Sequence, residues 1–257
     1  MNEIQKMEFS ELIHILSEHG VTEYAVLIGS WAEFSYVMAG VLPGYEYGPK
    51  TRDIDLLICN MHLPREKINM FELAEKAHFT PSEPDYMTES VKFFSRSGEL
   101  EVEFLIGQKG AGTQNYYDTN FGVKAEALRH TEITLSNIMK CNVFGVDLLV
   151  PTPEAYVVGK AVINYDRKEG KKEKDADTII RMWPFLNKDE VGRIVSTLSK
   201  NERKHYMEFM NSHKSEMLSS AEISNILQPA KVKQIANKER LAAFLTEDDS
   251  ISEQKKR

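Results

Sequence analysis

Two short segments of the chain place acidic side chains at alternate positions between apolar residues. Asp53 and Asp55 form the first pair, and Glu101 and Glu103 form the second. Alternate residues of a β-strand point to the same face, so the two acids of each pair lie side by side. Close carboxylates repel each other unless a divalent cation such as Mg²⁺ binds them through its preferred oxygen ligands. The alternatives are a solvated strand end, with Arg52 as ion-pair partner, and an edge strand with one polar face.

A phosphate site is suggested by Gly29-Ser30, which follows the apolar stretch 24–28 and precedes a predicted helix. The N-terminus of a helix presents free N–H groups and the positive end of the helix dipole, and glycine lets a phosphate approach the backbone. Many turns between a strand and a helix contain glycine and serine, so this pair alone is a weak signal. It gains weight only in combination with the carboxylates.

Lys160 lies within an apolar segment, between two small residues and close to three valines. This position is hard to explain as ordinary surface and favours a functional role for the ammonium group. Residues 160–174 contain six Lys or Arg and three Asp or Glu, a local charge of +3 in a chain with a net charge of −7. We expect Asp175 to cap a helix or to pair with a basic neighbour. We expect a solvated helix face to contain Lys171, Lys172 and Lys174.

The elements that position these side chains follow from hydrophobic periodicity and turn residues. We expect strands at 24–28, 53–58, 91–95, 100–106 and, as a pair, within 142–150. We expect helices at 8–19, from residue 29, and at 65–78, 154–166, 171–182, 188–199, 201–217, 221–227 and 230–245. If the two acidic strands are neighbours, a third carboxylate joins the pair of aspartates. The chain then divides into an α/β part (1–150), a helical part (151–246) and a charged tail (247–257).

Composition excludes several classes of protein. With 32 Lys and Arg against 39 Asp and Glu among 257 residues, the net charge disfavours a protein that coats nucleic acid. No apolar run is long enough to span a membrane, and the N-terminal residues lack the apolar core of a signal peptide. Neither Cys59 nor Cys141 lies in a CxxC motif or a His-rich segment, so a disulfide framework or a zinc site is not expected. We therefore expect free thiols and a cytoplasmic location.

In combination, the motifs resemble a known family. A strand, a Gly-Ser turn, a helix and two strands with alternating acids are the layout of the DNA polymerase β-like nucleotidyltransferase superfamily. The segments that resemble it are IGSWAEF (28–34), TRDIDLLI (51–58) and LEVEFLIG (100–107). The stretch 150–179 is similar to the helical region of small bacterial nucleotidyltransferases, including abortive-infection and toxin-type members. The resemblance implies an α/β (α+β) fold, in which a mixed sheet with helices on one face precedes a helical C-terminal domain.

The resemblance also implies roles for individual residues. The catalytic acids and ligands of two Mg²⁺ ions fall on Asp53, Asp55 and Glu103. Glu103 is preferred because the apolar residues 104–106 resemble the family strand, while Glu101 shares its face and remains the alternative. The nucleotide-binding positions are Gly29, Ser30 and Lys160, to which we add Arg52.

The spacing of the motifs departs from the family. Asp53 follows Ser30 by 23 residues, more than many family members have. The additional segment, within 31–50, contains five aromatic residues of interest: Trp31, Phe34, Tyr36, Tyr45 and Tyr47. It could form a lid or an acceptor pocket with aromatic faces for stacking. The alternative is a buried helix stripe of Trp31, Phe34 and Val37, which leaves Tyr45 and Tyr47 unexplained.

The reaction that the resemblance implies is transfer of a nucleoside monophosphate from an NTP, as co-substrate, to an acceptor. The acceptor could be RNA, such as a tRNA 3′ end, or a protein hydroxyl, as in toxin-like relatives. A small molecule such as an aminoglycoside is the alternative acceptor, and a catalytically silent nucleotide-binding protein is the alternative class. Further expected partners are a cognate antitoxin or a second copy of the chain, with no membrane partner.

Overall fold

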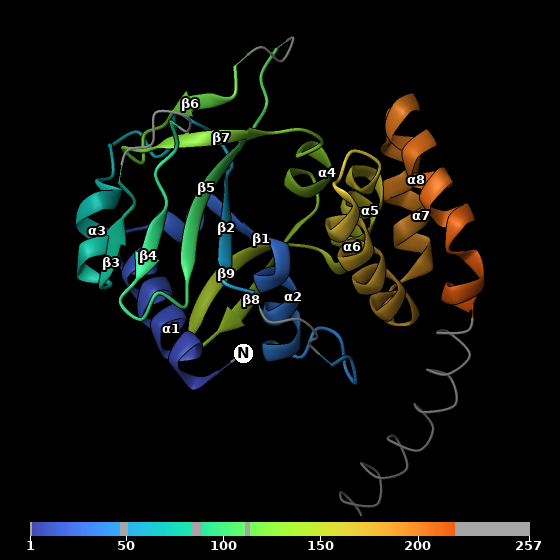
Figure 1. The fold of residues 1–257 in the computed structure, drawn as a ribbon, viewed down its shortest axis with the longest axis horizontal. Coiled ribbons are helices and arrows are strands. Elements are labelled where there is room, and N and C mark those ends of the chain that lie inside the picture. Colours follow the sequence, from blue (N-terminus) through green and yellow to red (C-terminus); the bar gives the residue numbers. More distant parts are fainter. Residues whose placement is uncertain (1, 47–50, 84–88, 111–113, 219–257) are drawn as a thin grey trace, which may run out of the picture.

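The computed structural model describes residues 2–46, 51–83, 89–110 and 114–218. Within them, a nine-stranded mixed sheet has the order β3-β4-β5-β2-β1-β9-β8, and β7 joins β5 and β6 (Figure 1). The strands are β1 (Ala25–Ile28), β2 (Asp53–Ile58), β3 (Phe79–Pro81), β4 (Phe93–Ser95), β5 (Glu101–Gly107), β6 (Tyr116–Asp118), β7 (Lys124–Leu128), β8 (Ile138–Val143) and β9 (Val146–Pro151). The helices are α1 (Glu3–Glu18), α2 (Gly29–Met38), α3 (Met70–Lys76), α4 (Glu132–Leu135), α5 (Pro153–Asn164), α6 (Glu169–Met182), α7 (Lys188–Thr197) and α8 (Lys200–Ser212).

The two acidic strands lie side by side at the centre of the sheet. β2 and β5 pair in parallel, and β1 pairs with β2 in antiparallel orientation on the other side. Ile54 and Val102 alternate with the acids and are almost fully buried, as expected for strands with one face on the core. The two acidic strands are therefore neighbours, which the sequence leaves open, and the acids of both project from the same face.

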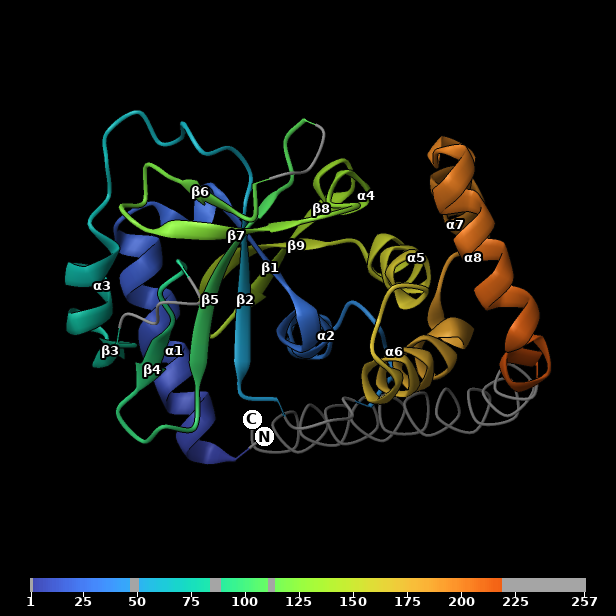
Figure 2. The same cartoon turned by 45° about the horizontal axis from the view of Figure 1, so that its top comes forward.

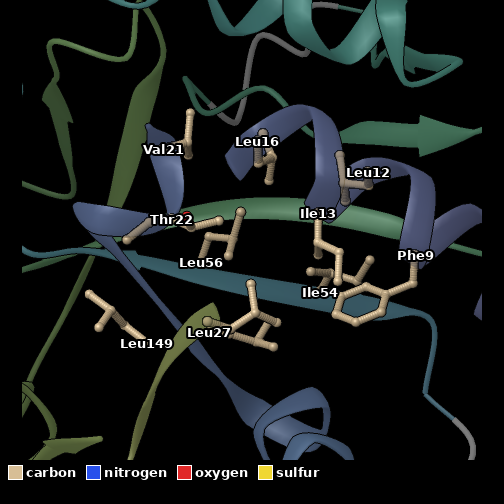
Figure 3. A pocket seen from close by; sticks show the side chains of 12 residues that line it. Phe9, Leu12, Ile13, Leu16, Val21, Thr22, Leu27, Ile54, Leu56 and Leu149 are labelled. Atoms are coloured by element: carbon tan, nitrogen blue, oxygen red, sulfur yellow. The ribbon is translucent and has the colours of Figure 1, made fainter. Parts of the chain in front are cut away.

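Helix α1 covers the opposite face of the sheet. Its apolar residues recur at helical spacing and point toward β1 and β2 (Figure 3). They are Phe9, Leu12, Ile13 and Leu16. The hollow between helix and strands has a volume of about 10 Å³ and an apolar lining. Because such a space is at the lower limit for one water molecule, it is a packing gap of the core.

The face that carries the acids also has an apolar part. Val26, Leu57 and Leu105 form a small buried cluster further along the strands, and Leu135 of α4 packs against it. The acidic and apolar parts follow each other along β2 and β5. Helix α1 thus packs on the face of the sheet opposite the acids, whereas α4 packs against the apolar part of the acid-bearing face.

The helical region begins where β9 ends. The Thr152 hydroxyl accepts a hydrogen bond from the N–H of Ala155 at 3.2 Å, and Pro153 lies in the first turn of α5, one residue before the expected start at 154. α5 packs against α6, α7 and α8, and these helices stand beside the sheet (Figure 2). Tyr36 of α2 donates to the carbonyl oxygen of Pro151 at 2.7 Å, which fixes the start of the helical region relative to α2.

Several boundaries differ from those expected. α1 begins at Glu3 rather than at residue 8 because Asn2 and Gln5 form a capping box. α3 is shorter than 65–78 because Asn69 caps its start. The periodicity does not predict β3, β6, β7 or α4, since segments of three to five residues carry too little of it.

Some expectations lie outside the described residues. These are the helices at 221–227 and 230–245 and the tail at 247–257, and the division of the chain at residue 150 stays a prediction. Cys59 and Cys141 are free thiols, as expected. Among the helices of the described part, none has the length and apolar character needed to cross a membrane.

Candidate active site

Four carboxylates share one face of the sheet where β2 and β5 begin. The register places Asp53 beside Glu101 and Asp55 beside Glu103. Neighbouring strands are about 4.8 Å apart. Asp53 is exposed, whereas the other three acids are partly buried. The structure thus brings together the predicted acids, and both alternatives for the third carboxylate lie on this face.

Asp55 is the carboxylate whose ionisation is most altered. Burial raises the pKa of Asp55 from its ordinary 3.8 to about 7, and the charges of Glu103 and Asp53 add to the rise. The charges of Lys160 and Arg167 act in the opposite direction. A buried acid among like charges gains most from a bound cation, so Asp55 is suited to bind one.

Gly29 lies directly against Asp55. Ile28 pairs with Asp55 across β1 and β2, so the chain turns into α2 beside this carboxylate. Gly29 has a φ of +64°, and a Cβ atom there would lie 2.2 Å from Oδ2 of Asp55. Ile28, the N-cap residue of α2, makes no side-chain hydrogen bond to the first turn. The N-terminal N–H groups around Gly29 and Ser30 therefore lie uncapped beside the acids.

Lys160 extends from α5 to a buried acid on α6. Its ammonium contacts Oδ1 of Asp175, and Nε of Arg167 lies 3.4 Å from Oδ2. The Asp175 side chain is 6% exposed and that of Lys160 is 13% exposed. The expected pairing of Asp175 with a basic neighbour is confirmed. The positive charges of Lys160 and Arg167 both lower the pKa of Asp55. By pairing with both side chains, Asp175 is a positioning residue that holds their charges near the carboxylates.

We expect Asp175→Asn to lower the free energy of unfolding by about 3 kcal/mol, because it leaves the ammonium of Lys160 buried without a counter-charge. The Lys160→Met variant removes that ammonium, so the double variant should recover at least about 1 kcal/mol relative to the sum of the single effects. Urea unfolding of the four proteins measures this coupling. Strictly additive losses would show that the pair is not energetically linked.

The remaining predicted basic residues lie on the surface. Arg52 is exposed, and its guanidinium donates to the carbonyl oxygen of Gly98 in the turn before β5. Its contact with a nucleotide stays a prediction. Lys171 and Lys174 are exposed on α6, as a solvated helix face requires, whereas Lys172 is partly buried.

Sequence reasoning missed Lys92. Its Nζ atom lies 2.5 Å from Oε1 of Glu101 and also contacts Glu103. β4 pairs antiparallel with β5, and continuing the register by one residue places Lys92 opposite Glu103. A two-residue hairpin turn at Ser97-Gly98, between the strands expected at 91–95 and 100–106, implies this register, so the signal is present in the sequence.

The acids fit Mg²⁺ by their chemistry, because they offer only oxygen ligands and a bound cation would offset the repulsion among them. In the part of the chain that the structure describes, no three His, Cys, Asp or Glu side chains converge as a metal-binding group. Lys92 engages Glu101 and Glu103 instead. Asp53 and Asp55 are then the pair best placed to receive an ion first.

The aromatic residues after Ser30 belong to the core. Trp31 and Phe34 are buried, and Trp31 stacks on Phe9 of α1 with ring centroids 4.0 Å apart. Tyr45 is also buried, so the hypothesis that its ring is open for stacking on an acceptor is wrong. Tyr47 lies outside the described residues.

Tyr45 instead belongs to a polar cluster between α2 and α6. Its hydroxyl donates to Glu33 at 2.5 Å and accepts from Arg181 at 3.0 Å. The Glu33 side chain is fully buried. The Tyr45 ring lies beside the ring of Phe185, with centroids 5.5 Å apart. This cluster ties the loop after α2 to the helical region and explains why an aromatic residue of a Gly- and Pro-rich loop is buried.

A cavity lies at the other end of the acid-bearing face. Its volume is about 360 Å³, and it is bordered by the ends of β2 and β5, by His130 and by Glu202 of α8. Nδ1 of His130 lies 2.8 Å from Oε1 of Glu202, which joins the sheet to the helical region. The buried side chains of Leu57 and Leu105 lie between this cavity and the carboxylates.

Comparisons with known proteins bear on the fold and on the family of the chain. The crystal structure of an antigenic nucleotidyltransferase-like protein from Paracoccidioides brasiliensis is similar with a TM-score of 0.50 and 16% identity, over 82% of this chain and 91% of that one. At this identity the likeness bears on the fold alone. In a sequence comparison, no curated protein matches the chain. A family model described as nucleotidyltransferase matches residues 8–184, which are 177 of the 257 residues. The chain therefore belongs to this nucleotidyltransferase family.

Proposed function

We propose that the chain transfers a nucleoside monophosphate from an NTP to a hydroxyl group of an acceptor, in a Mg²⁺-dependent reaction of the DNA polymerase β-like type. The observation that carries the proposal is the position of Asp55 beside both Glu103 and the uncapped first turn of α2. Carboxylates for metal ions and N–H groups for phosphates then form one site, as nucleotidyl transfer requires.

Each group has a separate task in this proposal. Gly29 and Ser30 receive the β- and γ-phosphates at the N-terminus of α2, and Lys160 adds a positive charge from α5. The metal ligands are Asp53, Asp55 and Glu103, with Glu101 beside them. Bound Mg²⁺ would neutralise the triphosphate and stabilise the charge of the transition state. Without the positive charge of Mg²⁺, the acids of the site repel the negatively charged NTP.

The transfer forms a bond between the acceptor oxygen and the α-phosphorus, and it breaks the bond from that phosphorus to the oxygen that bridges to the β-phosphate. Pyrophosphate leaves toward the first turn of α2 and Lys160. The proton of the acceptor hydroxyl passes to a carboxylate. Glu103 is suited to take it because burial raises the pKa of Glu103 and because it lies beside Asp55.

For the acceptor, we propose RNA or a protein hydroxyl in a toxin or defence role, with the exposed lysines of α6 as a local basic surface. A small-molecule acceptor is the second candidate. The cavity beside His130 and Glu202 has a volume of about 360 Å³, within the range of small-ligand sites, but Leu57 and Leu105 separate it from the carboxylates. A small acceptor would therefore have to bind nearer to Asp53 and Asp55.

The position of a radioactive label tests the reaction. The full chain is incubated with each NTP, labelled at the α- or γ-phosphorus, and with total RNA, with protein or with small hydroxyl compounds that include an aminoglycoside. We expect the α-label but not the γ-label to enter one acceptor pool, only with Mg²⁺ and not with Asp53→Ala. Transfer of the γ-label would indicate a kinase, and undiminished transfer by Asp53→Ala would place the reaction at another site.

A further inference from the structure

Lys92 contacts two of the four carboxylates directly. Its ammonium lies between Oε1 of Glu101, at 2.5 Å, and Oε1 of Glu103. The Lys92 side chain is 40% exposed, whereas those of Glu101 and Glu103 are 17% and 21% exposed. The ammonium therefore joins two half-buried acids from the solvent side.

The backbone holds Lys92 at this place. Its N–H donates to the hydroxyl of Ser82 at 3.2 Å, and its carbonyl oxygen accepts from the N–H of Ser82 at 2.7 Å. On the other side, the register of β4 and β5 sets Lys92 opposite Glu103. Cross-strand pairs of opposite charge stabilise a sheet. The contact thus follows from the pairing of β3, β4 and β5.

An ion shared by Glu103 and Asp55 would bind the carboxylate of Glu103, whose Oε1 atom Lys92 contacts. Mg²⁺ binds carboxylate oxygens at about 2.0–2.1 Å, and an ammonium binds them at about 2.8 Å, so both use the same lone pairs. Two cations on one carboxylate also repel each other, more strongly where burial reduces the screening by water. Lys92 and a divalent ion therefore weaken each other's binding to Glu103.

We propose that Lys92 competes with a divalent ion for Glu101 and Glu103: it neutralises this pair in the metal-free protein, and it moves toward solvent when an ion binds there. The inference rests on the proposed function, in which the acids hold Mg²⁺. The two ion positions are then unequal. Asp53 and Asp55 accept an ion readily, whereas the position at Glu103 fills only at a higher metal concentration.

Titration of the full chain with Mn²⁺ alone, followed by electron paramagnetic resonance of the free ion, tests the competition. The wild type is expected to bind one Mn²⁺ tightly and a second weakly. In Lys92→Gln, the affinity of the weaker position should rise by about tenfold or more, as expected when one unit charge a few ångströms away is removed. Lys92→Arg keeps a cation and should behave as the wild type.

Two further variants separate this effect from others. Lys76 on α3 has a similar exposure, 45%, and pairs with one acid, Glu72, so Lys76→Gln should leave Mn²⁺ binding unchanged. Lys92→Gln with Glu101→Gln keeps the net charge of the wild type on this face, which protects folding. It should still bind Mn²⁺ more tightly than the wild type, because the ammonium has gone from Glu103.

The outcomes distinguish the inference from the proposed function. If the wild type binds Mn²⁺ and loses it in Asp53→Ala, but folded Lys92→Gln and the double variant bind as the wild type does, the competition is overturned and the metal site stands. If none of these proteins binds Mn²⁺, both the competition and the metal-dependent function are overturned. If the affinity for Mn²⁺ rises equally in Lys76→Gln, the change in net charge alone explains the effect, and the inference is overturned.

Discussion

Asp55→Asn is expected to abolish nucleotidyl transfer while the chain remains folded. Asparagine has the shape of aspartate but lacks the charge that binds a cation, so we expect kcat/KM to fall by about 10³-fold or more. The assay is transfer of the α-label at saturating Mg²⁺, with circular dichroism to confirm folding. Activity within about tenfold of the wild type would show that Asp55 does not bind the ion that the reaction needs.

The same variant should remove a pH-dependent cost of folding. Because burial raises the pKa of Asp55 to about 7, the folded chain keeps this proton over a range where the unfolded chain, near 3.8, has lost it. The contribution of Asp55 to the stability of the metal-free wild type therefore falls as the pH rises from about 4 to about 7, and Asp55→Asn lacks this contribution. Urea unfolding at pH 5 and pH 8 in EDTA should show the advantage of the variant widening by roughly 3 kcal/mol. A constant difference would contradict the raised pKa.

Gly29→Ala is expected to lower activity by about 100-fold or more, through Asp55 rather than through the loss of any functional group. The new Cβ atom would lie 2.2 Å from Oδ2 of Asp55, so the carboxylate must move. A displacement of about 1 Å at a reacting group can cost about 100-fold in rate. The φ of +64° adds strain of about 1 kcal/mol to the folded state. Label transfer and urea unfolding measure the two effects.

Gly20→Ala is the matched control for this substitution. Gly20 has a similar φ of +71°, but a Cβ atom there would meet no atom within 4 Å. Both alanine variants should therefore lose a similar amount of stability from backbone strain, and only Gly29→Ala should lose activity. If Gly20→Ala were equally inactive, general destabilisation would explain the result. The close approach of Gly29 to Asp55 would then not be needed for activity.

The sequence predicts the carboxylates because their signal is local. Alternation alone places Asp53 and Asp55 on one face of a strand, and it does the same for Glu101 and Glu103. The Gly-Ser turn marks the start of α2 for the same reason. What the alternation leaves open is whether the two strands are neighbours and in which register. The structure supplies both, and all four acids then lie together.

Contacts that depend on distant parts of the chain are not predictable in this way. Glu33, Tyr45 and Arg181 form one cluster only because α6 packs beside α2, and no local pattern marks a buried glutamate in an apolar helix. Lys92 is an intermediate case. Its partner Glu103 follows from the hairpin register, but the contact with Glu101 also needs the side-chain packing of the finished sheet.

One measurement shows most directly whether metal and nucleotide share this site. It is the anomalous difference map of a crystal grown with Mn²⁺ and an NTP analogue that cannot be cleaved between its α- and β-phosphates. We predict a Mn²⁺ peak within coordination distance of Asp53 and Asp55, with the β- and γ-phosphates against Gly29 and Ser30. Nucleotide and Mn²⁺ found only elsewhere, such as beside His130 and Glu202, would contradict the assignment of the active site.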